Sequence, residues 1–280
     1  MLILKKKIKK RINKNSRKGV LKIQKNKPKL TIAVYLILRF LVILCLVAQS
    51  IHSNWNNVFL CLLTLVLFTL PDLVSDKFNI TLPSGLEIIV YIFIFSSAIL
   101  GEIQNFFGIF SHWDTMLHTL NGFLCAGVGF SLIDILNNDE NLHISMTPEF
   151  VALVALCFSM TIGVCWEFFE FSADRYLGKD MQKDRIINKI SSVKLNPEVK
   201  NEKIVINNIN KTIIYSDNDQ TITVIDGGYL DIGLTDTMKD LFVNFLGAMA
   251  FSIAGYLYIK NRDNYHIIEN FLPRLKSKIE

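Results

Sequence analysis

The chain has 280 residues, of which 51% are hydrophobic and 20 are phenylalanine, and its mean hydropathy is +0.34. These values are too high for a typical soluble protein of this length and indicate an integral membrane protein. The net charge of +5 is unevenly spread, because residues 1–30 carry 13 basic and no acidic side chains, whereas the remainder carries 17 basic and 25 acidic ones.

The N-terminal block predicts a basic cytoplasmic tail over residues 1–30. It does not resemble a cleavable signal, because its basic region is about thirty residues long and several apolar segments follow it. Clustered lysine and arginine side chains attract anionic lipid headgroups, so we expect these headgroups as partners of the tail. Because no aromatic residues interrupt the block, we expect no nucleic acid partner.

Six apolar segments follow, each near the ~20 residues needed to cross ~30 Å of hydrocarbon. They cover about residues 31–51, 57–75, 87–109, 115–136, 149–172 and 237–259. We therefore predict an all-α integral membrane protein with about six transmembrane helices and a small β-rich extracytoplasmic insertion between helices five and six. Its predicted parts after the first tail are helices 1–5 over residues 31–172, a loop over 173–235, helix 6 over 236–260 and a second cytoplasmic tail over 261–280.

The positive-inside rule gives the predicted orientation of these spans in the cell membrane. It places the basic tail in the cytoplasm, so that six spans leave both termini cytoplasmic and the loop over 173–235 extracytoplasmic. Four basic residues directly after the fifth span disagree with this orientation: Arg175, Lys179, Lys183 and Arg185. We give the 13 charges of the tail more weight.

The insertion, over about residues 186–234, differs in composition from the spans. Residues 204–206, 212–215 and 221–225 are short β-branched runs, and residues 217–219 and 226–228 supply turns. We expect a small β-rich unit packed on the membrane face, acting as a lid, as a surface for a partner, or without a function of its own.

Ionisable side chains lie at helical spacing inside or beside the apolar segments, where each costs roughly 2.5 kcal/mol or more at a helix centre. Four groups share this feature: Glu102; Asp114 and His118; Glu167, Glu170 and Asp174; and Asp236, Asp240 and Asn244. Within each group the members share one helix face. The predicted orientation puts all four groups in the extracytoplasmic half, so we expect four helices to bring their carboxylates together there.

Helix capping is the simpler explanation for Asp114 and Asp236, the latter as an N-cap, because acidic side chains stabilise helix N-termini. It does not suit Glu167 and Glu170, which lie near the predicted C-terminus of the fifth helix, where the macrodipole disfavours negative charge.

Small residues recur on the fourth and sixth segments and allow helix backbones to approach closely in lipid. They predict that His118 and Asp240 lie near one another. The structural alternative for Asp240 is an ion pair with Lys239 or with Arg175.

A family resemblance rests on four sequence blocks: Leu100-Gly101-Glu102; Trp113-Asp114 with His118 and Gly122-Phe123; Trp166-Glu167 through Glu170-Phe171; and Asp236-Thr237-Met238 with Asp240-Leu241 and Gly247-Ala248. In order and spacing they resemble the uncharacterised bacterial YjdF-like multi-pass membrane proteins, over roughly residues 85–181 and 235–258. They are more distantly similar to the VanZ-like proteins, linked to glycopeptide resistance, but lack an arginine expected ahead of the last block. The resemblance implies membrane placement and the site positions, and no established reaction.

The first functional hypothesis is a site for a ligand or for catalysis in the outer half of the bilayer. Its candidate metal ligands are Asp114, His118, Glu167 and Asp240, which suit a divalent cation that engages a lipid phosphate or activates water. Alternatively His118 is a general base oriented by Asp114, with Glu167 or Glu170 as the acid. Further candidate ligand-binding residues are Glu102, Asp174, Asp236, Asp240 and Asn244. The substrates within reach include lipid-linked cell-envelope precursors.

Two other function classes stay open. A transporter needs polar groups across the whole membrane, and the cytoplasmic half offers only Arg39, Asp72 and Asp134. In a structural or partner-binding protein the acids would form hydrogen bonds between helices and the insertion would meet the partner. The sequence alone leaves open whether the protein is an enzyme.

Overall fold

A computed structural model describes residues 27–77, 79–137, 146–198, 200–218, 220–261, 268 and 270–275. Most of the two predicted tails, over 1–30 and 261–280, therefore lies outside the described residues. Six helical spans of the described chain are long and apolar enough to cross a membrane: Lys29–Ile51, Trp55–Lys77, Ser84–Ile103, Trp113–Asn137, Pro148–Leu177 and Leu234–Lys260. Short strand pairs lie between the fifth and sixth spans, so the predicted fold class is confirmed.

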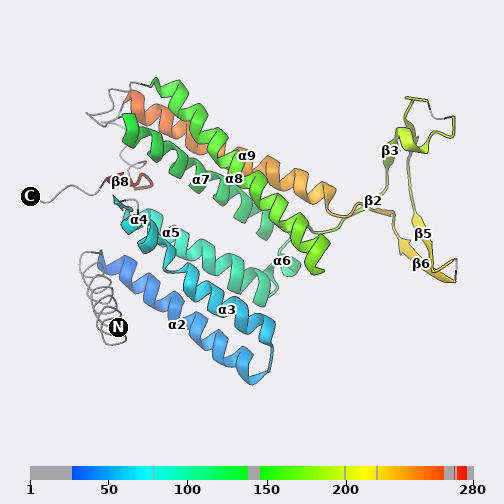
Figure 1. Ribbon diagram of the computed structural model, residues 1–280, viewed down its shortest axis with the longest axis horizontal. Coiled ribbons are helices and arrows are strands. Elements are labelled where there is room, and N and C mark those ends of the chain that lie inside the picture. Colours follow the sequence, from blue (N-terminus) through cyan, green and yellow to red (C-terminus); the bar gives the residue numbers. More distant parts are fainter. Residues whose placement is uncertain are drawn as a thin grey trace, which may run out of the picture.

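The first three spans pack together as one group, which occupies the lower part of Figure 1. Its helices are α2 (Lys29–Ile51), α3 (Trp55–Leu67) with α4 (Leu70–Lys77), and α5 (Ser84–Phe95) with the π-helix η1 (Ser96–Ile103). Their shared apolar core contains Val42, Cys61, Phe68, Tyr91 and Ile99. The short helix α6 (Phe106–Ile109) leads from this group to the next.

The last three spans form a second group, in the upper part of Figure 1. Its helices are α7 (Trp113–Asn137), α8 (Pro148–Leu177) and α9 (Leu234–Lys260). Their core is built from side chains of all three helices, including Phe130, Val151, Ala155, Ala248 and Phe251. The candidate site lies in this group.

Two glycines set the distance between α7 and α9. A Cβ atom on Gly122 would lie 2.0 Å from the carbonyl oxygen of Asn244, and one on Gly247 would lie 2.0 Å from that of Thr119. Any side chain at either position would collide with backbone, so only glycine allows the two helices to approach this closely. The crossing brings the first halves of both helices together, and these halves carry the predicted site residues.

Helix α8 has clear start and stop signals and is longer than predicted. Thr147 caps its N-terminus through its hydroxyl oxygen, and Pro148 takes the first position. The helix continues to Leu177 and ends at Gly178, which has the left-handed φ of 60°. The predicted end at residue 172 is thus five residues short.

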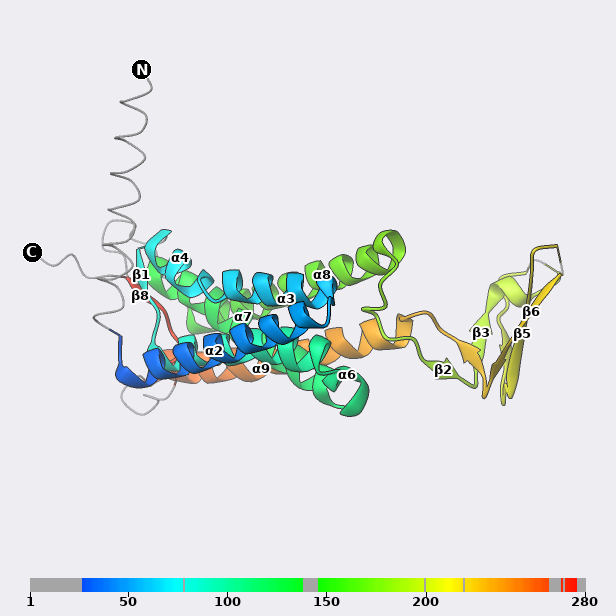
Figure 2. The same cartoon turned by 90° about the horizontal axis from the view of Figure 1, so that it is seen from below.

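At one end of the bundle the C-terminal segment joins the two helix groups. Strand β1 (Ile80–Thr81), between α4 and α5, pairs antiparallel with β8 (Arg274–Leu275). Leu272, just before β8, lies in the core of the second group. Figure 2 places this strap, residues 270–275, at the end of the bundle opposite the insertion.

The described residues of the insertion form three strand pairs, and its three predicted runs are confirmed as strands β4, β5 and β6. The pairs are β2 (Ile186–Ile187) with β7 (Tyr229–Leu230), β3 (Ile190–Ser192) with β4 (Ile204–Ile206), and β5 (Lys211–Ser216) with β6 (Thr221–Asp226). The expectation that this unit packs on the membrane face is wrong, because Figures 1 and 2 show it extending away from the helix ends. The β2–β7 ribbon lies between the helices and the other two pairs and so carries them outward.

Candidate functional site

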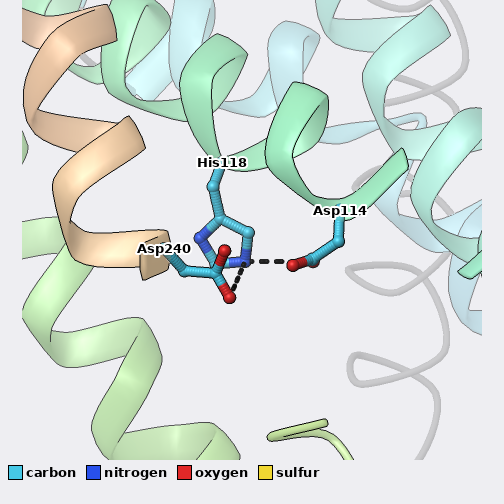
Figure 3. A group of neighbouring side chains, drawn as sticks. All are labelled: Asp114, His118 and Asp240. Atoms are coloured by element: carbon cyan, nitrogen blue, oxygen red, sulfur yellow. Dashed lines mark ion pairs between the residues drawn. The ribbon is translucent and has the colours of Figure 1, made fainter. Parts of the chain in front are cut away.

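His118 is the centre of a buried polar cluster to which three helices contribute. Helix α7 provides Asp114 and His118, α8 provides Glu167 and Glu170, and α9 provides Asp240. On one side of the imidazole ring, Nε2 lies 3.4 Å from Asp114 Oδ1 and 4.0 Å from Asp240 Oδ2, as Figure 3 shows. On the other side, Nδ1 lies 3.8 Å from Glu167 Oε1. The predicted closeness of His118 and Asp240 is confirmed.

Lys239 completes the side of the ring that faces Asp114 and Asp240. Its Nζ lies 3.7 Å from Asp114 Oδ2 and 3.5 Å from Asp240 Oδ1. Each of these two carboxylates therefore directs one oxygen toward His118 and the other toward Lys239. The pairing of Asp240 with Lys239 is confirmed, whereas Arg175 forms no ion pair with Asp240 in the described part of the chain.

The side of the ring that faces Glu167 and Glu170 has no comparable positive charge in the described chain. Among the described residues, no lysine or arginine forms an ion pair with either glutamate. The Trp166 indole N–H donates to Glu170 Oε1 at 2.8 Å. The side chain of Glu167 is 6% exposed, and its Oε2 atom has no hydrogen-bond partner in the described structure. A buried, unpaired carboxylate oxygen is costly, which makes this position suited to a ligand.

The carboxylates of Asp174 and Asp236 are engaged at the base of the insertion. Asp174 accepts two backbone N–H groups of the loop after α8, at 2.6 and 2.8 Å. Asp236 accepts the Lys183 backbone N–H at 2.9 Å and the Arg185 guanidinium at 3.2 Å. The predicted N-cap role of Asp236 is wrong, because Gly233 takes that position and Asp236 lies in the first turn of α9.

Asn244 and Glu102 lie outside the cluster. Asn244 accepts from the Asn121 amide at 3.2 Å and contacts the sulfur of Met160 at 3.7 Å, so it lies where the three helices pack. Glu102 is exposed on η1, in the first helix group. The structure thus brings together the carboxylates of three helices rather than four, because the third span packs with the other group.

The cluster contains two sets of three side chains that could hold a metal ion. One is Asp114, His118 and Asp240, and the other is His118, Glu167 and Glu170, with the ligand atoms of each set within 4.8 Å of one another. Both sets combine one imidazole nitrogen with carboxylate oxygens, a donor combination found for divalent transition ions. The two sets share His118.

The order of these residues along the chain agrees with a family match. The model of the family described as "Predicted membrane protein (DUF2238)" matches residues 32–261. The chain belongs to this family. The match takes in the insertion and nearly all of the six spans, and it confirms the predicted YjdF-like membership. No curated protein and no solved structure matches the chain, and the similarity to VanZ-like proteins stays an expectation.

In this DUF2238 chain, the expectation that the macrodipole of α8 disfavours Glu167 and Glu170 is wrong. Because α8 runs to Leu177, Glu167 and Glu170 lie about two or more turns from its C-terminus. The macrodipole acts within the last turn of a helix, so it bears little on either glutamate. Their position instead puts them beside His118.

The sequence did not lead us to predict a buried acid at the end of the helix bundle where the strap lies. Glu87 lies in the first turn of α5, with its Oε1 3.1 Å from Lys27 Nζ, which also lies 2.6 Å from Asp72 Oδ1. Burial alone would lower the pKa of Lys27, but the Asp72 hydrogen bond and the nearby negative charges raise it. The expectation that the half predicted to be cytoplasmic offers only Arg39, Asp72 and Asp134 is therefore wrong. An acid directly before a long apolar run was the available signal.

Proposed function

We propose that this multi-pass membrane protein binds a divalent cation in the cluster around His118 and uses it to hold a phosphate-bearing lipid or lipid-linked ligand. The observation that carries the proposal is the position of His118 between two pairs of carboxylates, with Glu167 Oε2 buried and unpaired among the described residues. A bound cation accounts for both features. An ion with an open coordination position then binds phosphate oxygens directly.

The energetics of buried charge support a ligand over a purely structural role. Each ionisable group within the bilayer costs roughly 2.5 kcal/mol or more, and like charges placed together add repulsion. Four carboxylates surround His118, and Lys239 is the one ammonium group paired with them in the described chain. Helix packing alone needs no such excess of negative charge. A divalent cation offsets it.

The charge of the N-terminal tail and the arrangement of the bundle support our proposal for the side of the membrane on which the cluster lies. We propose that both termini are cytoplasmic, because residues 1–30 carry 13 basic side chains. The insertion and the start of α2 lie at opposite ends of the bundle (Figure 2), which supports an extracytoplasmic position for the cluster. Exposed Trp166, Phe168 and Tyr176 lie on the same part of α8 as the two glutamates, as expected for an aromatic belt at the interface. Lipid-linked cell-envelope precursors, which carry phosphate groups, are the ligand class that we propose for a site on that side of the membrane.

The first experiment measures bound metal and co-purifying lipid in the full-length protein in nanodiscs, by elemental analysis and native mass spectrometry. The wild type and the Glu102→Gln control are expected to retain about one divalent ion per chain. Glu167→Gln and His118→Ala are expected to lose it without losing the folded, monodisperse state. Glu102 is the matched control because it is an exposed glutamate on a span of the other helix group. A wild type that takes up no ion, even after incubation with zinc or manganese, refutes the proposal.

Transport is the second candidate, favoured by one observation. The Glu87–Lys27 pair adds buried charge at the end opposite His118, so ionisable groups occur at both ends of the bundle. The two clusters belong to different helix groups, and Phe130 and Phe251 fill the core of the second group. Manganese uptake into proteoliposomes distinguishes the candidates. Uptake that requires both Glu87 and Glu167 would replace the binding proposal with transport.

A further inference from the structure

The two carboxylate pairs around His118 differ in the charges they already have beside them. We infer that the cation is a first-row transition ion such as zinc or manganese, and that it binds His118, Glu167 and Glu170. In this arrangement Asp114, Asp240 and Lys239 orient the ring and do not touch the ion. The inference rests on the proposed function and assigns its ion and its ligands.

The Asp114–Asp240 side already has a positive partner. Lys239 Nζ lies 3.7 Å from one carboxylate and 3.5 Å from the other, with 28% of its side chain exposed. The same two carboxylates lie 3.4 and 4.0 Å from His118 Nε2. All four oxygens therefore face a nitrogen at ion-pair distance, although Asp114 Oδ2, like Glu167 Oε2, forms no hydrogen bond in the described structure. A divalent cation placed here would be repelled by the ammonium group and would compete with it for the same oxygens.

The Glu167–Glu170 side has two carboxylates and no ammonium or guanidinium partner in the described chain. Both glutamates are buried, with residue exposures of 5% and 7%. Glu167 Oε1 lies 3.8 Å from His118 Nδ1, and Glu167 Oε2 is free to accept a ligand bond. Here a cation meets unbalanced negative charge, so this side is the stronger binding position.

The imidazole ring fits this assignment chemically. A neutral histidine has one nitrogen that accepts a metal and one that carries a proton, and metal-bound histidines donate that proton to a carboxylate, a backbone carbonyl or water. Nδ1 faces Glu167, so it is the metal-binding nitrogen, and Nε2–H then points to Asp114, the nearer acid at 3.4 Å. The Trp166 N–H bond to Glu170 orients the second glutamate in the same manner.

The donor set identifies the class of ion. Imidazole nitrogen and carboxylate oxygen are both ligand types of catalytic zinc sites, in which three protein side chains leave the fourth position for water or substrate. Calcium takes about six to eight oxygen ligands, and magnesium is usually bound without nitrogen ligands. The open position then accepts a phosphate oxygen of the proposed ligand.

Cobalt(II) is a direct probe, because a thiolate ligand on cobalt gives an intense absorption band that oxygen ligands do not give. The five native cysteines are first replaced by alanine or serine. In that background Glu167→Cys, Glu170→Cys, Asp114→Cys and Asp240→Cys are each loaded with cobalt in nanodiscs. The two glutamate variants are expected to show the thiolate band, with about one cobalt per chain. The two aspartate variants are expected to bind cobalt without the band, up to about 100-fold more weakly than the background protein.

The possible outcomes separate this inference from the proposed function. A band in the aspartate variants and not in the glutamate variants overturns the ligand assignment, as does cobalt binding with no band in any variant. Failure of the cysteine-free background itself to bind cobalt overturns the proposed function. Two glutamate positions are used so that one misfolded variant, detected by size-exclusion chromatography, still leaves a test.

Discussion

Replacing Gly247 by alanine tests whether the close crossing of α7 and α9 positions Asp240 beside His118. The new Cβ atom would lie 2.0 Å from the Thr119 carbonyl oxygen, whereas ordinary contact begins at 3.4 Å. Both neighbours are backbone, so the helices must separate by about 1.4 Å at this point. Because Asp240 lies two turns before Gly247 on α9, the separation also moves its carboxylate away from His118, from which it is now 4.0 Å.

Overpacking of this kind costs about 1–3 kcal/mol, partly offset by about 1 kcal/mol from the better helix propensity of alanine. We expect a net loss of up to about 2 kcal/mol in the free energy of unfolding, together with at least tenfold weaker cobalt binding. Reversible unfolding in mixed micelles and cobalt titration measure the two quantities.

Gly127→Ala is the matched control. The change is the same, in α7, but the new Cβ would meet the Phe251 ring at 3.0 Å, and a side chain gives way more readily than backbone. We expect it to leave cobalt binding unchanged and to cost less stability. If Gly247→Ala is as stable as the wild type and binds cobalt equally well, close backbone contact does not position the site.

Three further predictions concern other parts of the chain. Lys27→Ala is expected to destabilise the protein by up to about 3 kcal/mol, because it leaves the Glu87 carboxylate buried without its ammonium partner. Glu87→Ala is expected to cost less, because Lys27 keeps Asp72 at 2.6 Å, and the two changes are expected to be non-additive in a double-mutant cycle. A cysteine introduced by Gln220→Cys, in a background without native cysteines, is expected to react with an impermeant maleimide from outside the cell. Labelling only after the cells are opened contradicts the proposed orientation. Asp236→Ala is expected to speed amide hydrogen exchange at Lys183 at least tenfold, and unchanged exchange would show that Asp236 does not hold the insertion.

The spans and the strands of the insertion could be predicted because each depends on local pattern. Long apolar runs specify membrane helices, and β-branched runs between turn residues specify β4, β5 and β6. The placement of the insertion depends on tertiary contacts, which a pattern of alternating residues does not encode. Its extension away from the helices was therefore missed.

The candidate site was predictable in part, for the same reason. Helical spacing identified His118 and the acids on α7, α8 and α9, and small residues indicated that two of these helices meet. Which span packs with which is a long-range property, so Glu102 was grouped with a cluster that its helix does not reach. The role of Lys239 also required coordinates, because only the distances show that it serves two carboxylates at once.

The strap has a consequence for the order of events during synthesis. Strand β8 follows all six spans in the chain, yet its partner β1 lies between the second and third. A ribosome has therefore to finish every span before β1 finds its partner and before Leu272 enters the core of the second group. Until then the β1–β8 pairing and the contacts of Leu272 are missing, so the strap is the last link between the two helix groups to form.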